Sequence, residues 1–425
     1  MTAARTKGRI RQGTTGTLRR IVSAAAVTGL LAIGIGAAPT ASAADVRSKQ
    51  WYLDAMHAEE IWETATGEGV KVALIDSGVN PSTPALKGRV LEGMDATGVP
   101  GDEMDDYSGH GTTIAELIAG SGEGGGLQGL APGAEIISYR VSDTDLQNKY
   151  AVNAEESEDA IRAAADSDAR IINVSGGSEY PSEAERQAVE YAQGKGKLII
   201  AAVGNTGHKD NKPGYPASYP GVVGVAASGP DGRVAHYSQH GDFVDLAAPG
   251  NSIPSWCDTN FTRYCDGNGG TSAASALASA SAALIWSAHP DWTANQVLRV
   301  MLESAGRGEG WKKGTVSNYL GHGIIRPGAH INRGIGKPGD PDINPLTNKK
   351  TGPGAVEEQK QSPPPKDSAS PSPKGSEGKP GAEAAVAGSE EKADGGSLGI
   401  LLGGVAAAAA LAGGVLFVVR RRRGA

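Results

Sequence analysis

Cysteine is scarce in this chain of 425 residues, which contains only Cys257 and Cys265. A structural zinc site needs about four ligands, and none with metal spacing lie near this pair, so zinc is disfavoured. In an oxidising compartment the two thiols predict one disulfide that closes a short surface loop, and two free thiols are the alternative. So short a loop predicts local rigidity more than a large gain in stability.

Positive charge is also scarce over most of the chain. The formal net charge is −7, yet six basic residues precede Ile21 and four arginines follow Val419, so the residues between are strongly acidic. Nucleic acids and anionic lipids attract basic surfaces. The charge distribution therefore predicts no nucleic-acid partner, and it leaves the substrate open.

A long hydrophobic run lies near each end of the chain. Within residues 1–43, a basic segment precedes the apolar run Ile21 to Ala38, and the small residues Ala41-Ser42-Ala43 follow it. This order predicts a secretory signal peptide, with the mature chain beginning near Ala44. The apolar run is short for a membrane span, and an uncleaved anchor is the alternative.

The second run, residues 398–419, has no charged residue and is long enough to cross a bilayer. The arginines of the tail, residues 420–425, favour the cytoplasmic side. A single transmembrane helix is therefore predicted, with a buried core helix as the alternative. With a cleaved signal, this places the protein at the cell membrane, its folded domain extracellular and its C-terminus cytoplasmic.

The remaining residues divide into three parts. Residues 337–397 are rich in Pro, Gly, Ser, Lys and Glu, and too few apolar groups are present to offset the entropy of ordering. A disordered stalk is therefore predicted there. Residues 66–336 suit one α/β domain, and residues 44–65 form an N-terminal extension.

Short apolar runs alternate with helical patterns inside the domain. The predicted strands are 70–75, 135–141, 171–174, 198–203 and 222–226, and the predicted crossover helices are 155–165 and 183–193. Such βαβ alternation predicts a mostly parallel sheet with helices on both faces, which is a three-layer α/β architecture.

Three reactive side chains have neighbours typical of an active site. Asp76 ends the first predicted strand, where open α/β sheets place their chemistry, and His110 lies between two glycines at a predicted helix start. Ser272 precedes an Ala/Ser-rich helical run, 273–289, whose N-terminus points amide groups toward it. Ser272 alone would be read as a helix cap. Together, the order Asp, His, Ser predicts a serine-triad hydrolase.

With these motifs the chain resembles the subtilase superfamily of serine endopeptidases, and most of all the mycosins, its membrane-anchored branch associated with type VII secretion. The resemblance implies a subtilisin-like fold with catalytic Asp76, His110 and Ser272. It also implies that Asn205, in an Ala-Ala-Val-Gly-Asn segment, donates to the oxyanion. The substrate-binding positions that it implies are Ser175, Gly176, Gly177 and Gly214.

Other expectations also rest on the resemblance. Catalysis needs no metal or cofactor. For the acidic loop 102–106, a structural calcium site is one interpretation and a solvated cluster of charges is the alternative. The N-terminal extension of mycosins wraps the domain, and Trp51-Tyr52 are the residues suited to anchor it. The family commonly has Met or Phe at Ala273 and Pro at Ser275, so the chain departs from the pattern there.

Three functions follow from these observations. The first is a membrane-anchored endopeptidase acting on protein or peptide substrates and linked to a type VII secretion membrane complex. The second is a structural subunit of such a complex, with dispensable protease activity. The third is a surface protease of broad specificity.

Overall fold

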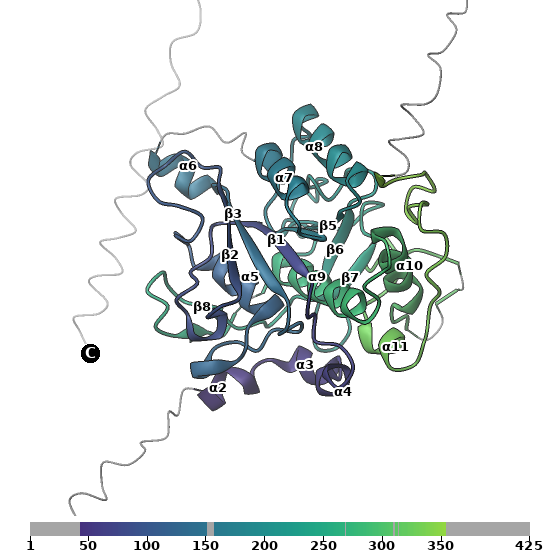
Figure 1. Ribbon diagram of the computed structural model, residues 1–425, viewed down its shortest axis with the longest axis horizontal. Coiled ribbons are helices and arrows are strands. Elements are labelled where there is room, and N and C mark those ends of the chain that lie inside the picture. The colour runs from purple at the N-terminus through teal and green to yellow at the C-terminus, as the bar shows by residue number, and fades with distance from the viewer. Residues whose placement is uncertain (1–42, 151–156, 268, 309–310, 313, 354–425) are drawn as a thin grey trace, which may run out of the picture. The chain divides into compact units, whose positions relative to one another are not determined.

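Seven parallel strands form the central sheet of the domain (Figure 1). The computed structural model describes residues 43–150, 157–267, 269–308, 311–312 and 314–353, all within one compact unit. The strands are β1 (Lys71–Asp76), β2 (Val90–Asp95), β3 (Glu135–Arg140), β4 (Ile171–Val174), β5 (Leu198–Ala202), β6 (Val223–Ser228) and β7 (Leu246–Pro249). Their order is β2-β3-β1-β4-β5-β6-β7, and every neighbouring pair is parallel.

The two faces of the sheet bury separate hydrophobic cores. In β1, Val72 and Leu74 pack into one core, and Ala73 and Ile75 pack into the other. Successive side chains of a strand point to opposite faces, so a strand buried on both sides reads as a continuous apolar run. This is why the central strands could be predicted from short apolar runs.

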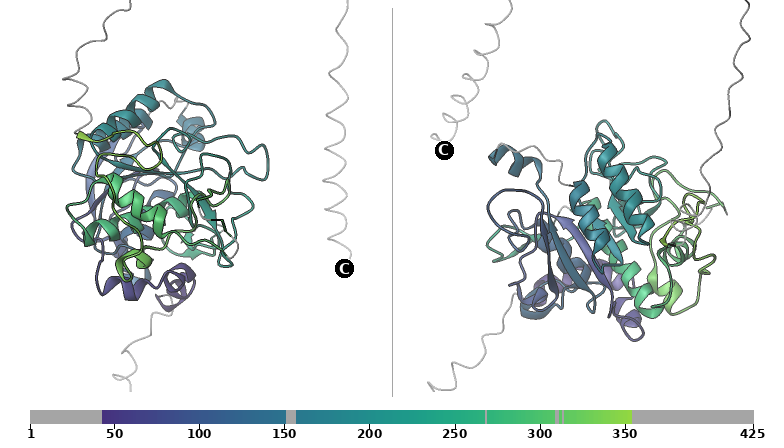
Figure 2. Two further views of the ribbon diagram at one scale, coloured as in Figure 1. Left: turned by 90° about the vertical axis from the view of Figure 1, so that its right-hand side faces the viewer. Right: turned by 45° about the horizontal axis from the view of Figure 1, so that its top comes forward.

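Helices cover both faces, which confirms the three-layer prediction (Figures 1 and 2). The helices α7 (Ser157–Asp166) and α8 (Glu183–Gly194) pack on one face, and α5 (His110–Ala119) and α9 (Thr271–Ala288) pack on the other. Further helices are α6 (Thr144–Tyr150), α10 (Ala294–Ser304) and α11 (Pro327–Ile331).

Some boundaries differ from those predicted. The sequence patterns missed β2, whose middle residues are exposed, and β7, which has only four residues and ends in Pro249. The helix α5 begins at His110, three residues before the helix predicted over 113–119, and α9 begins at Thr271, two residues before the predicted run 273–289. Both reactive side chains, His110 and Ser272, therefore lie in the first turn of a helix.

The N-terminal extension folds against the domain as α2 (Ala43–Ser48), α3 (Trp51–Ala55) and α4 (Ala58–Trp62). Tyr52 is completely buried, and the Trp51 indole N–H donates to the Asn251 carbonyl at 3.1 Å. The burial of Tyr52 and the hydrogen bond of Trp51 are the packing expected if this aromatic pair anchors the extension. The indole hydrogen bond ties the extension to the loop that follows β7.

The predicted start of the stalk at residue 337 is wrong, because residues 337–353 pack on the domain. The Pro341 carbonyl accepts hydrogen bonds from Thr293 and Asn295 at 2.8 and 2.9 Å. The Gly352 N–H donates to the Gln193 carbonyl at 3.1 Å. The domain surface supplies hydrogen-bond partners for the backbone of this polar segment. Composition alone does not reveal those partners.

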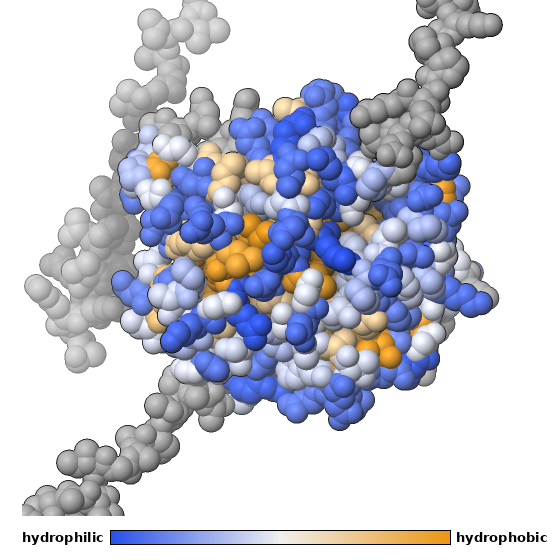
Figure 3. Space-filling model, viewed as in Figure 1, coloured by the Kyte–Doolittle hydropathy of each residue, from blue (hydrophilic) through white to orange (hydrophobic). Residues whose placement is uncertain are grey.

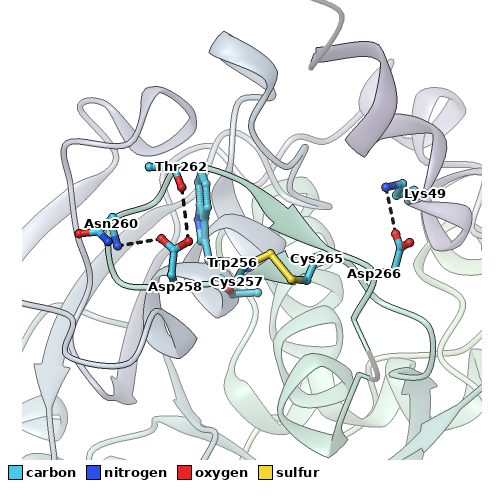
Figure 4. The surroundings of a disulfide bond; sticks show 9 residues. Lys49, Trp256, Cys257, Asp258, Asn260, Thr262, Cys265 and Asp266 are labelled. Carbon is cyan, nitrogen blue, oxygen red and sulfur yellow. Dashed lines mark hydrogen bonds and ion pairs between the residues drawn. A yellow bond between two sulfur atoms is a disulfide. The ribbon is translucent and has the colours of Figure 1, made fainter. Parts of the chain in front are cut away.

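The two cysteines form the predicted disulfide (Figure 4). It joins Cys257, the residue after β8 (Ser255–Trp256), to Cys265 in β9 (Tyr264–Cys265). The two strands pair as an antiparallel hairpin outside the main sheet. Close by, the Lys49 ammonium lies 2.9 Å from an Asp266 carboxylate oxygen, which links the N-terminal extension to this region.

Figure 3 shows a largely hydrophilic face with hydrophobic side chains gathered near its centre. Within the part of the chain that the structure describes, no helix is both long and apolar enough to cross a bilayer. The predicted signal peptide and the predicted span, residues 398–419, lie outside that part.

Candidate active site

Asp76 and His110 form a hydrogen-bonded pair at the carboxyl end of β1. Asp76 is the last residue of this strand and His110 is the first residue of α5, and the two are joined at 2.7 Å between Oδ1 and Nδ1. The Asp76 side chain is 4% exposed, whereas that of His110 is 47% exposed. One ring nitrogen thus contacts a buried carboxylate while the ring remains accessible.

The electrostatics of the pair favour a charged imidazole. Burial opposes the charged form of each group, but their mutual attraction and hydrogen bond prevail. The pKa of Asp76 is lowered, with help from the Ser77 N–H, which donates to Oδ1 at 2.7 Å. The negative charge of Asp76 raises the pKa of His110 to about 9.

Asp106 holds the start of α5 in place. Its Oδ1 accepts hydrogen bonds from the Ser77 hydroxyl and the Gly109 N–H, both at 2.8 Å. Its Oδ2 accepts from the N–H and the hydroxyl of Thr112 at 2.8 and 2.6 Å. Sequence patterns did not identify Asp106 or Ser77 as parts of the site, because their role depends on contacts between distant segments.

These contacts also bear on the expected calcium loop, residues 102–106. The Asp106 carboxylate points inward to the start of α5, and Asp102 accepts a hydrogen bond from the Met104 N–H at 2.9 Å. Among the described residues, no group of three or more metal-ligating side chains is assembled. The structure therefore gives no support to calcium in this loop.

Ser272 lies in the first turn of α9, beside the end of β4. Its hydroxyl donates to the Ser175 carbonyl at 2.8 Å, and the residue is only 8% exposed. Ser175 directly follows β4, which neighbours β1, so the serine lies at the same edge of the sheet as Asp76. In this conformation the Ser272 hydroxyl therefore donates to a backbone carbonyl at the end of β4.

Asn205 follows the next strand of the sheet, β5, and is oriented by the residue before the serine. Its Oδ1 accepts from the Thr271 N–H at 2.9 Å and from the Thr271 hydroxyl at 3.1 Å. The Thr271 hydroxyl in turn accepts from the Gly204 N–H at 3.1 Å. With its oxygen occupied in this way, the Asn205 amide group has its NH₂ available to a ligand.

A cavity of about 300 Å³ adjoins Asn205. The positions expected to bind substrate all line it, and they are Ser175, Gly176, Gly177 and Gly214. A Cβ atom at Gly214 would lie 2.8 Å from the Val203 carbonyl oxygen, and one at Gly177 would lie 2.6 Å from that of Tyr215. Both contacts are too short for a Cβ atom, so glycine permits the close approach of two backbone segments at the wall of this cavity.

The departure at Ser275 changes little in this region. Its hydroxyl donates to the Ser272 carbonyl at 2.8 Å, inside the first turns of α9. Serine therefore bonds to the helix backbone at the position where the family commonly has proline. Ala273 is 6% exposed and packs in the core.

The fold and these residues define a class of protein. A parallel sheet carries an aspartate–histidine pair, a serine at a helix start and an oriented amide, all at the carboxyl ends of neighbouring strands. The model of the Subtilase family matches residues 67–323, more than half of the chain. The chain belongs to this family and is a subtilisin-like serine endopeptidase.

Known relatives agree with this membership. The chain is 32% identical to thermitase from Thermoactinomyces vulgaris over 278 residues, which cover 64% of this chain and 95% of thermitase. It is 36% identical to subtilisin E from Bacillus subtilis (strain 168) over 265 residues, covering 61% and 65% of the two chains.

Solved structures of mycosins are also similar. One is a serine protease, MycP1, described as an essential component of the type VII (ESX-1) secretion system. It has a TM-score of 0.57 and 30% identity, over 69% of this chain and 90% of that one. MycP1 from Mycobacterium smegmatis has a TM-score of 0.58 and 27% identity, over 68% and 86% of the two chains.

Proposed function

We propose that this protein is a membrane-anchored extracytoplasmic serine endopeptidase that uses Asp76, His110 and Ser272 as a catalytic triad. The observation that carries the proposal is the 2.7 Å hydrogen bond between His110 Nδ1 and the buried Asp76 carboxylate, at the sheet edge that also holds Ser272. This arrangement supports nucleophilic catalysis because a serine hydroxyl is a weak nucleophile until a base removes its proton.

In the proposed reaction, Ser272 Oγ attacks the scissile carbonyl as His110 takes its proton. His110 then gives the proton to the leaving amine, the C–N bond breaks, and an acyl-enzyme remains. Water then attacks the acyl-enzyme in the same way, with His110 as the base, and the carboxylic acid product is released. Asp76 holds the imidazole in the required tautomer and stabilises its charged form.

The negative charge of the tetrahedral intermediate needs hydrogen-bond donors. The NH₂ group of Asn205 is one, because Thr271 occupies the amide oxygen. The backbone N–H of Ser272 is the other, since first-turn N–H groups lack partners within the helix. We assign the side chain on the acyl side of the scissile bond to the neighbouring cavity of about 300 Å³.

The test is peptide hydrolysis by the full chain in detergent or membranes. Ser272→Ala should lower kcat by about 10⁶-fold, the scale of a lost triad serine in subtilisin, and should abolish labelling by a fluorophosphonate probe. Ser281→Ala is the matched control, because its hydroxyl donates to the Leu277 carbonyl of its own helix. Undiminished hydrolysis by Ser272→Ala would refute the assignment.

We further propose a link to type VII secretion, supported by the similarity to MycP1 and MycP3 structures. A deletion strain complemented with Ser272→Ala separates the candidate roles. Lost secretion supports an essential protease, and restored secretion supports a structural subunit with dispensable activity. A broad-specificity surface protease predicts normal secretion in the deletion strain itself.

Membrane anchoring through residues 398–419 is part of the proposal and rests on the uncharged run followed by arginines. Removing residues 398–425 should release active protein into the medium. The full chain should instead sediment with membranes and be digested by protease added outside the cell. A full chain that is released without proteolysis would contradict the anchor.

A further inference from the structure

The disulfide hairpin touches the backbone just before His110. The Trp256 N–H donates to the Thr113 hydroxyl at 3.1 Å, which joins β8 to the first turns of α5. Gly109 has a φ of 79°, and a Cβ there would lie 3.3 Å from the Asp258 carbonyl oxygen. The turn that places His110 is thus in close contact with the hairpin, whose residues Trp256 and Asp258 are labelled in Figure 4.

Glu116 makes a second connection between the hairpin and α5. It lies in the same helix as His110, is completely buried, and accepts a 2.5 Å hydrogen bond from the Tyr264 hydroxyl. The Tyr264 ring stacks on Trp256, with centroids 3.9 Å apart. One carboxylate thereby holds both aromatic residues of the hairpin strands against the helix.

This carboxylate is costly to bury. Its other oxygen, Oε1, lies near the Thr83 hydroxyl and the Trp256 indole N–H, but none of these three groups makes a hydrogen bond of standard geometry with a described residue. The titratable groups that face it are two tyrosines, Tyr264 on β9 and Tyr52 on α3, and burial raises the pKa of Glu116 to about 7. A polar group kept at such a cost is a candidate for a specific task.

We propose that Glu116 is a positioning residue that fixes hairpin β8–β9 as the wall of the leaving-group side of the substrate cleft. The inference rests on the proposed function. The leaving amine must lie within proton-transfer reach of His110, so substrate residues beyond the scissile bond pass on the side of Gly109 and the hairpin. The acyl side instead lies toward the cavity beside Asn205.

Acyl transfer to an added amine measures binding on the leaving-group side of the cleft separately from binding on the acyl side. An ester substrate forms the acyl-enzyme, and an added dipeptide amide competes with water for it. The amine nitrogen forms the new C–N bond as the bond from the acyl carbon to Ser272 Oγ breaks, and His110 carries the proton from amine to serine. The ratio of aminolysis to hydrolysis measures how well the leaving-group side binds the amine.

Glu116→Leu and Tyr264→Phe each break the connection. Each should lower the ratio of aminolysis to hydrolysis about three- to tenfold, on the scale of one lost hydrogen bond to a buried carboxyl. The double variant should be no worse than Glu116→Leu alone, because the two residues act through one contact. The rate of ester hydrolysis should change less than twofold.

Glu116→Gln should restore the ratio, because its amide oxygen can still accept from Tyr264. Asn260→Ala is a control on the hairpin, since the backbone N–H that bonds to Asp258 remains. An unchanged ratio in folded Glu116→Leu would overturn the proposal, as would equal losses of aminolysis and ester hydrolysis. If Glu116→Leu does not fold, an unchanged ratio in Tyr264→Phe overturns it instead. If the wild type hydrolyses no ester and binds no fluorophosphonate, the proposed function itself has failed.

Discussion

Asp76 and His110, 34 positions apart in the sequence, are joined by a hydrogen bond of 2.7 Å between Oδ1 and Nδ1. The contact forms because β1 ends and α5 begins at the same edge of the sheet. Asp106 keeps the two elements in register by bonding to Ser77 on one side and to Gly109 and Thr112 on the other.

Asp76→Asn should lower kcat about 10⁴-fold while the protein remains folded. An amide that donates to Nδ1 would stabilise the imidazole tautomer that cannot accept the serine proton. The measurement is kcat on a peptide substrate, with thermal unfolding as the folding control. Asp168→Asn, which loses an ion pair with Lys71 at the other end of β1, should leave kcat unchanged. A small effect of Asp76→Asn would contradict the triad.

The activity should rise with pH to about 9. Burial opposes the charged imidazole, but the Asp76 carboxylate raises the pKa of His110 to about 9, and a protonated ring cannot accept a proton. Below that pH, kcat/KM for an uncharged ester should fall about tenfold per unit. A midpoint near 6.5 would show that Asp76 does not control His110.

The same shift has a consequence for stability. Folded His110 binds its proton more tightly than the unfolded chain, whose histidine pKa is about 6.5. Its contribution to the free energy of unfolding is therefore complete below pH 6.5 and disappears as the pH rises through about 9. Denaturant unfolding of wild type and His110→Ala from pH 6 to 10 measures it, and the difference between them should shrink with rising pH.

Thr271→Val should lower kcat about tenfold with little change in KM. Valine keeps the backbone N–H but removes the hydroxyl that bonds to Asn205 Oδ1 at 3.1 Å, so the amide becomes free to turn away from the oxyanion. Thr271→Ser retains the hydroxyl and should preserve kcat. Steady-state kinetics of both variants check this, and equal activity of Thr271→Val and wild type would show that the hydroxyl does not orient Asn205.

Tyr52→Ala should lower the free energy of unfolding by about 3–5 kcal/mol, because it leaves a cavity under a completely buried ring. Tyr52→Phe removes only the hydroxyl that Gln50 contacts at 2.5 Å, and should cost about 1 kcal/mol. Denaturant unfolding of the full chain measures both. A loss below 1 kcal/mol for Tyr52→Ala would show that the extension is not anchored there.

Local sequence was sufficient for the central strands and the reactive residues. The strand at 171–174 was predicted with its observed bounds, because both faces of β4 are buried and its residues are mostly apolar. The segments around Asp76, His110 and Ser272 could be found because each combines a reactive side chain with glycine or a helix start. The cysteines could be paired because they are so close in sequence.

By itself, the sequence determined the layered architecture and indicated the candidate residues Asp76, His110 and Ser272, since hydrophobic periodicity and short motifs act over a few neighbouring positions. Only the tertiary structure decided which partners the polar side chains meet. Asp106 bonds to the start of α5, Glu116 bonds to the disulfide hairpin, and residues 337–353 pack on the domain. These outcomes depend on which distant segment satisfies a buried polar group, and no local pattern of residues encodes that choice.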